Sequence, residues 1–368
     1  MGLLGQSSRP PLLAVPPTAA ADLLGGSGRA KIVWSQLRDG RDPFEESSGL
    51  GHKARHALEL AFSAQPPHSL LTSTVSACGT RKLLLRLRRG DEAVIIPQGA
   101  FSTLCVSSQV GCRQGCTFCA TGTMGLLRSL AADEILAQLH AAAAAVRQHG
   151  MPPLRNVFMG MGEPADNVEE ALSPGERQRR RGRSYVCVST VGPSPGHIRA
   201  LEPLPARLAW SVHAADDRLR RLLVPTTRHR MSELRDAWGE TADRGLMAEV
   251  TLIDGVNDGA DAAASLHGLL APLPGKTRVN LIPYNANAGL GAAGRLFRPA
   301  QPEAVRAFQR RLLDRGLICT VRTPRGNEES SACGMLRVEH AKGSRASRGD
   351  LASSVSDEFK EADTARMQ

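Results

Sequence analysis

Three cysteines with a C-x3-C-x2-C spacing are the residues whose type and spacing most clearly indicate chemistry. They stand in Cys112-Arg-Gln-Gly-Cys116-Thr-Phe-Cys119, within one short stretch of chain. Three thiolates so close together can hold three corners of a 4Fe-4S cluster and leave the fourth iron open for a substrate. An alternative is a structural zinc site that uses Cys105, seven residues before Cys112, as a fourth soft ligand. The spacing favours the cluster.

The elements that must position these cysteines alternate between strand and helix from residue 103 to residue 325. The predicted strands are 104–107, 156–160, 185–189, 208–213, 248–253, 279–282 and 318–322, and the predicted helices are 130–148, 196–203, 216–222, 231–244, 259–271 and 302–315. Such alternation predicts an α/β fold with a parallel sheet and outer helices, either an open sheet or a partial barrel. Chemistry in these folds lies at the carboxyl ends of the strands, and several of these strands end in polar or glycine-rich residues.

The flanking segments predict four regions along the chain. Residues 1–28 are rich in Ala, Pro, Gly and Leu and predict a disordered leader or a targeting peptide. Residues 29–69 predict a small helical accessory domain, and residues 70–336 a catalytic domain that starts with a β-rich extension. Residues 337–368 are polar and predict a disordered tail. Five arginines in 177–183 are interpreted as a solvated loop, with a phosphate-binding patch as the alternative.

Composition limits the class of partner. The 46 Lys and Arg residues exceed the 36 Asp and Glu residues, giving a formal net charge of +10, which suits a polyanion such as RNA. Aromatic residues make up only 4% of the chain, which argues against recognition through many stacking platforms. No uncharged apolar stretch reaches the length of a membrane-spanning helix, so no membrane partner is expected.

Further motifs surround the cysteines in a fixed order. They are Leu104-Cys-Val-Ser-Ser-Gln-Val-Gly-Cys112, Phe158-Met-Gly-Met-Gly-Glu-Pro164, Ser189-Thr-Val-Gly192, Trp210-Ser-Val-His-Ala214, Asn280-Leu-Ile-Pro-Tyr-Asn285 and Arg325-Gly326 with Ala332-Cys-Gly334. With the cysteine spacing, this order resembles the radical S-adenosyl-L-methionine (SAM) superfamily, and within it the adenine C2 methyltransferases of 23S ribosomal RNA. The resemblance covers about residues 29–336. It implies a partial (β/α)6-type barrel with a small N-terminal helical domain.

The resemblance implies a role for two more cysteines and one carboxylate. Cys333 would receive a methyl group from one SAM, and a 5′-deoxyadenosyl radical from a second SAM would abstract hydrogen from it. The carbon radical would add to adenine C2, Glu92 would remove the C2 proton, and Cys105 would release the product by forming a disulfide with Cys333. By the same resemblance, Cys112, Cys116 and Cys119 hold the cluster. The remaining cysteines, Cys78, Cys187 and Cys319, match no motif and are interpreted as packing residues.

The resemblance also implies a SAM pocket. Gly162 and Glu163 would meet the amino group of SAM, since a carboxylate suits an ammonium partner. The residues expected to line the rest of the pocket are Ser189, Ser211, Val212, His213 and Asn285. A lone histidine is usually structural, so no acid–base role is predicted for His213.

Several alternatives remain open at the level of sequence. A resistance-type relative methylates adenine C8 with the same cysteines, and a non-catalytic RNA-binding Fe–S protein is a rival of another class. The expected partners are ribosomal RNA, transfer RNA as a further substrate, and an electron donor such as flavodoxin or ferredoxin, with the chain a monomer. The resemblance implies the cytoplasm, whereas residues 1–28 leave a chloroplast or mitochondrion as the alternative.

Overall fold

The computed structural model describes residues 9–63, 68–87, 91–97, 99–171, 186–204, 206–241, 245–286, 290, 296–323 and 335–336. Its strands are β1 (Ser69–Val75), β2 (Arg81–Arg86), β3 (Asp91–Pro97), β4 (Ser102–Cys105), β5 (Gln109–Gly111), β6 (Leu126–Ser129), β7 (Leu154–Phe158), β8 (Val186–Thr190), β9 (Arg207–Ser211), β10 (Met247–Leu252), β11 (Arg278–Pro283) and β12 (Ile318–Val321). The α-helices are α1 (Pro17–Leu23), α2 (Ser27–Arg38), α3 (His52–Ala61), α4 (Ala120–Thr123), α5 (Ala132–Gln148), α6 (Val168–Ala171), α8 (Pro195–Leu201), α9 (Asp217–Leu223), α10 (Met231–Thr241), α11 (Ala260–Leu270) and α12 (Pro302–Leu313). Three short 3-10 helices are η1 (Leu12–Ala14), η2 (Glu46–Ser48) and η3 (Pro164–Asp166).

One large sheet organises the described part of the chain. Its ten strands follow the order β1-β2-β3-β4-β7-β8-β9-β10-β11-β12, and β5 and β6 form a separate two-stranded ladder. The pairs among β1, β2, β3 and β4 are antiparallel, whereas every pair from β4 to β12 is parallel. Since β1 and β12 stand at opposite edges of the order, the sheet is a partial barrel and not a closed one. The α/β fold class and the β-rich extension are as predicted.

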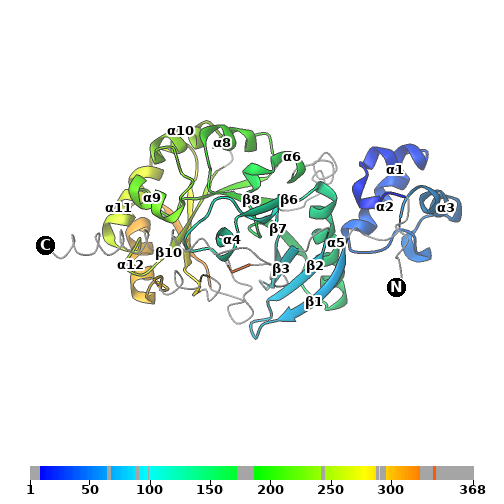
Figure 1. Ribbon diagram of the computed structural model, residues 1–368, viewed down its shortest axis with the longest axis horizontal. Helices are drawn as coiled ribbons and strands as arrows, with labels where there is room; N and C mark the ends of the chain where they lie inside the picture. Colours follow the sequence, from blue (N-terminus) through cyan, green and yellow to red (C-terminus); the bar gives the residue numbers. More distant parts are fainter. Residues whose placement is uncertain are drawn as a thin grey trace.

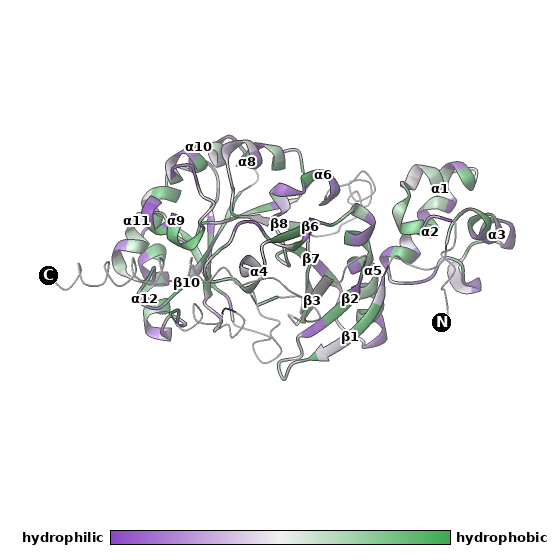
Figure 2. Cartoon of the chain, viewed as in Figure 1, coloured by the Kyte–Doolittle hydropathy of each residue, from purple (hydrophilic) through white to green (hydrophobic). Residues whose placement is uncertain are grey.

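Helices cover the outer side of the parallel strands. Figure 1 shows α8, α10, α11 and α12 following one another around the curved sheet, with the module of α1, α2 and α3 at the opposite end beside α5. All five residues of β8 are buried, as expected for a strand covered on both faces. Figure 2 shows hydrophobic residues on the inner strands and alternating character on the outer helices. All seven strands predicted between residues 103 and 325 are present, with bounds that differ by no more than two residues.

The N-terminal module differs from the prediction in where it begins. Residues 9–28, expected within a disordered leader or targeting peptide, instead contain η1 and α1. The cause is apolar burial, since Leu12, Leu13 and Leu24 are at most 4% exposed and join Val33 of α2 in one core cluster. That cluster continues into α5 and the barrel, so the module and the barrel share a core. The predicted tail at 337–368 and the Arg-rich segment 177–183 lie outside the described residues.

None of the helices in the described ranges combines the length and hydrophobicity that a bilayer crossing requires.

The contact between module and barrel depends on one glycine. Gly40 follows α2 with a φ of +66°, and a Cβ atom built on it would lie 2.2 Å from the backbone nitrogen of Ala144 in α5. We therefore expect Gly40→Ala to lower the free energy of unfolding by more than about 1 kcal/mol. The backbones at positions 40 and 144 must move apart, and the new alanine must adopt an unfavourable positive φ. Gly25 is a matched control, with a φ of +67° and only a flexible Arg29 side-chain atom at 3.9 Å. Equal losses for Gly40→Ala and Gly25→Ala in urea unfolding would contradict the close contact.

Candidate active site at the carboxyl edge of the barrel

The cysteine loop lies between the β5–β6 ladder and the short helix α4. Cys112 follows β5 directly, and its backbone nitrogen donates to the carbonyl of Gly125 at 3.0 Å, which closes the ladder over the loop. Cys119 is the N-cap of α4, and its backbone nitrogen donates to the carbonyl of Cys116 at 3.0 Å. These two turns gather the three thiols on one loop, as the spacing predicts.

The three thiols lie in surroundings that disfavour their ionisation. Cys116 and Cys119 pack against a buried apolar cluster that includes Phe118, Leu223 and Phe297. Burial raises the pKa of all three thiols, that of Cys116 to about 12, and repulsion between the thiolates adds to the effect for Cys112 and Cys116. Thiolates here require positive charge nearby, which iron ions supply.

One buried cation stands beside this loop. The Arg220 side chain is fully buried in α9, and its Nη1 donates at 2.6 Å to the carbonyls of Ser211 and Val212. Its Nη2 donates at 2.6 Å to the carbonyl of Val191, and its Nε donates at 3.3 Å to Oγ1 of Thr227. Arg220 therefore links, through hydrogen bonds, the residue that follows β8 and the residues at the end of β9.

Charge balance shows that an iron–sulfur cluster fits this loop. Among the residues that the structure describes, no carboxylate pairs with Arg220, and burial lowers its pKa to about 10 although Cys116 and Glu163 act in the opposite direction. A buried cation is costly without a partner of opposite charge, and a cluster held by three thiolates is such a partner. In the same ranges no three His, Cys, Asp or Glu side chains surround a single metal ion. Ligands of a four-iron cluster stand further apart, each on its own iron.

Glu163 is held by backbone amides. The side chain is 3% exposed, and its two oxygens accept at 2.9 Å from the backbone nitrogens of Ala165 and Val191. Burial raises its pKa to about 7, despite hydrogen bonds from Thr190 and the two amides that favour the ionised form. Glu163 thus joins the turn after β7 to the end of β8. A buried carboxylate at this edge suits the role expected for Glu163, which is to bind the amino group of SAM.

Gly162 lies in the same turn because no side chain fits there. Its φ is +101°, and a Cβ atom would come within 2.8 Å of Ser108 and Gln109. Gln109 reinforces the contact, since its Oε1 accepts from the backbone nitrogen of Glu163 at 2.9 Å. The turn after β7 therefore packs directly on the first strand of the cysteine ladder.

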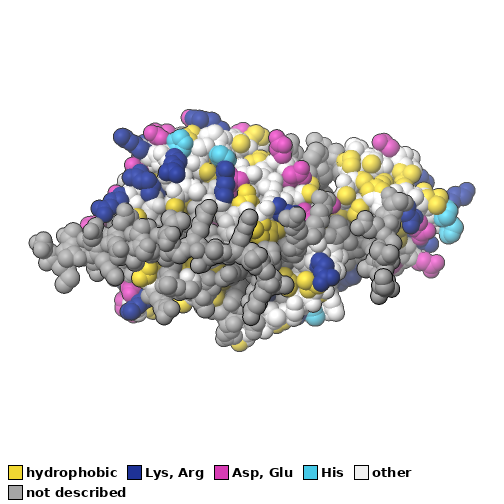
Figure 3. Space-filling view, viewed as in Figure 1, with side chains coloured by type: hydrophobic (Ala, Val, Ile, Leu, Met, Phe, Trp, Pro, Cys, Tyr) yellow, Lys and Arg dark blue, Asp and Glu magenta, His cyan; other side chains and the backbone are white. Residues whose placement is uncertain are grey.

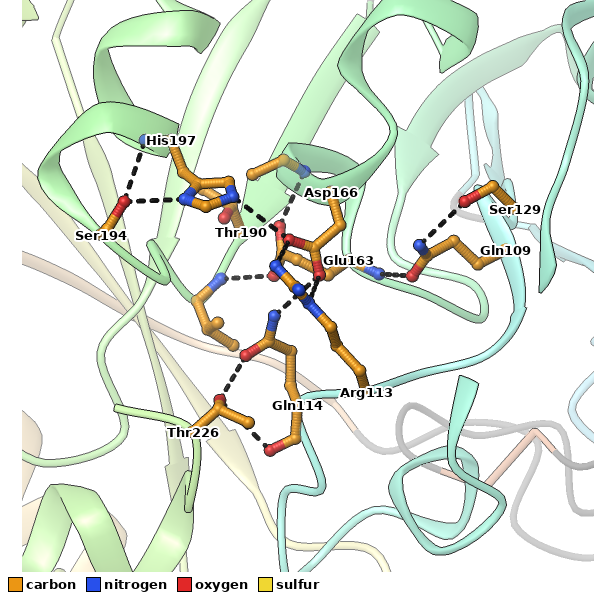
Figure 4. A network of polar contacts seen from close by, with 12 residues as sticks. Gln109, Arg113, Gln114, Ser129, Glu163, Asp166, Thr190, Ser194, His197 and Thr226 are labelled. Carbon is orange, nitrogen blue, oxygen red and sulfur yellow. Dashed lines mark hydrogen bonds and ion pairs between the residues drawn. The ribbon is translucent and has the colours of Figure 1, made fainter. Parts of the chain in front are cut away.

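Asp166 is the centre of a second network, which Figure 4 shows. Its carboxylate accepts two hydrogen bonds from Arg113, at 2.7 and 2.5 Å, and one from Nε2 of Gln114 at 2.9 Å. Nε2 of His197 lies 3.4 Å away, and Gln114 also accepts from the hydroxyl of Thr226. Arg113 and Gln114 belong to the cysteine loop, so Asp166 fixes that loop to η3 and α8.

A row of polar side chains crosses the inside of the barrel. The strand register aligns Ser211 of β9 with Glu249 of β10, and Glu249 with Asn280 of β11. The hydroxyl of Ser189 in β8 donates to Glu249 at 2.7 Å and lies 3.0 Å from the hydroxyl of Ser211, while Nδ2 of Asn280 donates to Glu249 at 3.2 Å. The two predicted serines therefore contact each other, and Ser189 is also bound to a carboxylate that is only 2% exposed.

His213 is buried and held by contacts with the neighbouring strand β10 and with the cysteine loop. It adopts a φ of +54°, and burial lowers its pKa to about 3, with a further contribution from Arg220. Its Nδ1 accepts from the backbone nitrogen of Thr251 at 3.2 Å, and its ring stands edge-on to Phe118 with 4.7 Å between ring centres. Val212, the residue before it, is fully buried. The peptide around His213 is thereby held close to the cysteine loop.

The four remaining predicted residues lie in different places. Asn285 is buried just after β11, at the same edge. Cys105 ends β4 and lies in a different apolar cluster from the cysteine loop, beside Leu336, which argues against the zinc alternative. Glu92 stands on β3, two residues from Val94, the residue that pairs with Cys105. Cys333 lies outside the described residues.

Several important residues carry no local signal in the sequence. Asp166, Arg220 and Glu249 act through contacts with segments up to 60 residues away along the chain or through strand register. The only available signal is an isolated polar residue in an apolar stretch, which Glu249 in Met247-Ala-Glu-Val-Thr-Leu252 provides.

Comparison with known proteins gives consistent matches over most of the chain. Residues 106–264 match the family model of the Radical SAM superfamily. The chain is 38% identical over 356 residues to the dual-specificity RNA methyltransferase RlmN of Anaeromyxobacter dehalogenans, covering 91% of this chain and 93% of that protein. It is 35% identical over 371 residues to the RlmN of Rhodopseudomonas palustris, with 91% of each covered. A radical SAM methyltransferase from Sphaerobacter thermophilus has a TM-score of 0.78 and 34% identity, covering 90% of this chain and all of that one.

The Asp166 network predicts the behaviour of one conservative substitution. Asp166→Asn places an amide against the donors of Arg113 and removes the negative charge. We expect a loss of about 1–2 kcal/mol in unfolding free energy and a clear drop in iron retained per chain after anaerobic reconstitution and gel filtration.

A matched control for that substitution is the exposed pair of Arg199 and Glu240, whose Nε and carboxylate lie 2.6 Å apart. Both side chains are more than half exposed, so Glu240→Gln should leave iron retention unchanged. Equal iron retention in Asp166→Asn and Glu240→Gln would show that the network does not hold the cysteine loop.

Proposed function

Because the chain belongs to the family of dual-specificity RNA methyltransferases within the radical SAM superfamily, we propose that it methylates adenine at C2 in 23S-type ribosomal RNA and also in transfer RNA. The proposal extends to the residues that carry the reaction. They are Cys333 as the methyl carrier, Cys105 as the releasing thiol and Glu92 as the base.

The position of Leu336 is the observation that supports this assignment most directly. Leu336 is 5% exposed and packs in the same apolar cluster as Cys105 inside the barrel. Its carbonyl accepts from Oγ1 of Thr121, two residues after Cys119, at 2.6 Å. Cys333 is three residues before Leu336, which limits its distance from that anchor to about 11 Å of extended chain. Leu336 therefore contacts Thr121 next to the cysteine loop and shares an apolar cluster with Cys105, which supports the assignment of Cys333.

The residues present suit both cofactors of the superfamily. Cys112, Cys116 and Cys119 would hold a 4Fe-4S cluster, and Arg220 would balance its charge. Gly162, Glu163, Ser189, Ser211, Val212, His213 and Asn285 would bind SAM at the carboxyl edge. When bound, these groups supply the one-electron cleavage of SAM that starts methyl transfer. Adenine C2 is electron-poor and cannot attack a methyl cation donor, so a radical route is needed.

The chain's own residues perform the remaining steps. Cys333 carries the methylene group that joins protein and RNA, and Glu92 removes the proton from C2. The one unpaired electron left on the adduct would return to the cluster, so the adduct is closed-shell before release. The Cys105 thiolate then attacks the sulfur of Cys333, so an S–S bond forms and the S–CH2 bond breaks. The electron pair of the broken bond passes to the carbon, and a proton completes the methyl group.

The position of methylation separates this proposal from methylation at C8. Nucleosides from RNA treated with the reconstituted enzyme and SAM should contain 2-methyladenosine when resolved by mass spectrometry. 8-Methyladenosine as the only product would support the resistance-type activity instead.

The cysteine assignment predicts different outcomes for two alanine variants. Cys105→Ala should accumulate a covalent RNA–protein adduct, because the thiol that breaks the S–CH2 bond is missing. Cys333→Ala should form neither adduct nor product. Denaturing gels with labelled RNA measure both outcomes. Cys78→Ala is the control, since Cys78 lies exposed between β1 and β2 and should leave turnover unchanged. Normal turnover by Cys105→Ala would disprove release through a disulfide.

A non-catalytic RNA-binding Fe–S protein predicts a different response to loss of one ligand. In that case Cys116→Ala removes a structural centre and unfolds the chain. We instead expect Cys116→Ala to keep the cooperative unfolding of the chain, while iron content and SAM cleavage are lost, because the shared core does not include the cysteine loop. Circular dichroism and iron analysis on the same sample distinguish the two.

A further inference from the structure

One surface segment next to the cysteine loop carries an unusual concentration of arginine. Residues 218–230 read Arg-Leu-Arg-Arg-Leu-Leu-Val-Pro-Thr-Thr-Arg-His-Arg, with five arginines and no acidic residue. Arg220 points inward and is fully buried. The other four are exposed and are called here the arginine ridge: Arg218, Arg221, Arg228 and Arg230. Figure 3 shows Lys and Arg side chains gathered at the end of the molecule that carries α9, α10 and α11.

The ridge forms no ion pair with the carboxylates that flank it in the described ranges. None of its guanidinium groups forms an ion pair with an acidic side chain in the described ranges. The adjacent carboxylates are used locally, since Asp216 accepts from the backbone nitrogen of Leu219 at 2.8 Å and Asp217 from that of Met231 at 2.7 Å. Glu233 lies 3.1 Å from Nδ1 of His229. The four ridge guanidinium groups are therefore exposed and form no ion pair with a carboxylate in the described ranges.

The segment that carries the ridge is attached directly to the cysteine loop. The backbone nitrogen of Thr117 donates to the carbonyl of Leu223 at 3.1 Å. Thr226 donates its hydroxyl to the side chain of Gln114. Leu223 and Val224 are fully buried in the apolar cluster against which Cys116 and Cys119 pack. The segment that carries the ridge thus packs directly against the loop expected to hold the cluster.

We propose that the arginine ridge is the docking surface for an acidic electron-transfer protein that reduces the cluster. The proposal depends on the proposed function, which requires a one-electron donor. Electron tunnelling weakens steeply with distance, so a donor must bind where the surface comes close to the cluster. Unpaired arginines attract an acidic partner over long range and speed its encounter.

The shape and composition of the ridge favour such a protein over RNA. Contacts in electron transfer are small and transient, and four charges on one short segment suit an interface of that size. RNA needs a longer row of phosphate contacts, and unpaired bases need aromatic side chains to stack on. Residues 218–230 contain no Phe, Tyr or Trp.

The redox step that this docking serves is balanced. A donor of the flavodoxin class gives one electron from its anionic flavin hydroquinone, which becomes the neutral semiquinone. The cluster takes up that electron and passes from the 2+ to the 1+ state. No bond and no proton is exchanged across the interface.

Charge reversal on the ridge tests the proposal. Arg221→Glu with Arg228→Glu in the reconstituted enzyme should raise the Kd for oxidised bacterial flavodoxin at least tenfold and weaken its salt dependence. Cluster reduction by photoreduced flavodoxin, followed by electron paramagnetic resonance, should slow by a similar factor. Reduction and methylation driven by dithionite should stay unchanged, because that small reductant needs no docking surface. Lysine at both positions should restore binding.

The matched control reverses two arginines of α12 and the turn after it, which pack on α11, β11 and β12 and not on the cysteine loop. Arg310→Glu with Arg315→Glu removes the same charge and should leave flavodoxin binding within twofold of the parent. Equal weakening by both pairs would overturn the proposal, as would unchanged binding by the ridge pair.

Dithionite reduces the cluster without a docking protein. Activity measured with dithionite therefore distinguishes loss of docking from loss of RNA binding and from failure of the proposed function. If the ridge pair weakens RNA binding and also loses activity with dithionite, the ridge binds RNA and the docking proposal is overturned. If the parent enzyme gives no methylated RNA with dithionite, the proposed function fails. The flavodoxin affinities of the ridge pair and the control pair of variants still show whether flavodoxin binds at the ridge.

Discussion

The buried guanidinium of Arg220 is the interaction on which the rest of the site depends. Three backbone carbonyls, from Val191, Ser211 and Val212, converge on it at 2.6 Å. A cation in such a place is unfavourable unless negative charge lies close by, and the cysteine loop is where that charge arises. One side chain therefore holds the peptides expected to line the SAM pocket and also acts electrostatically on Cys116 of the cysteine loop. For this reason the position of these peptides and the charge expected on the cluster depend on each other.

The same coupling explains why the turn after β7 is so restricted. Glu163 joins it to β8, Asp166 joins it to the cysteine loop and to His197, and Gly162 lets it approach β5. All three residues stand within one short stretch of the chain. A shift of this turn would move both the cysteine loop and the end of β8, so the Gly-Glu-Pro motif is a structural junction as well as the segment proposed to bind SAM.

Local patterns predicted most of the elements, whereas contacts between distant segments could not be predicted. The strand and helix periods and the spacing of Cys112, Cys116 and Cys119 are local, and the structure reproduces the strands within two residues. The roles of Glu249 and Asp166 depend on strand register and on pairs more than 50 residues apart, which no local pattern encodes. The start of the helical module was placed too late because Leu12 and Leu13 are apolar without a helical repeat, and only the shared core shows their burial.

Two buried cysteines inside the barrel, Cys105 and Cys187, have different neighbours. Cys105 and Cys187 lie in one register row through Val157 and share an apolar cluster. Burial and the nearby Glu249 raise the pKa of Cys187 to about 12, so its thiol stays protonated and cannot attack a sulfur. Cys105 is instead next to β3, the strand that carries Glu92, and packs with Leu336. Burial, with a smaller contribution from the Glu249 carboxylate that also bonds Ser189, therefore keeps the Cys187 thiol protonated, which suits a packing role.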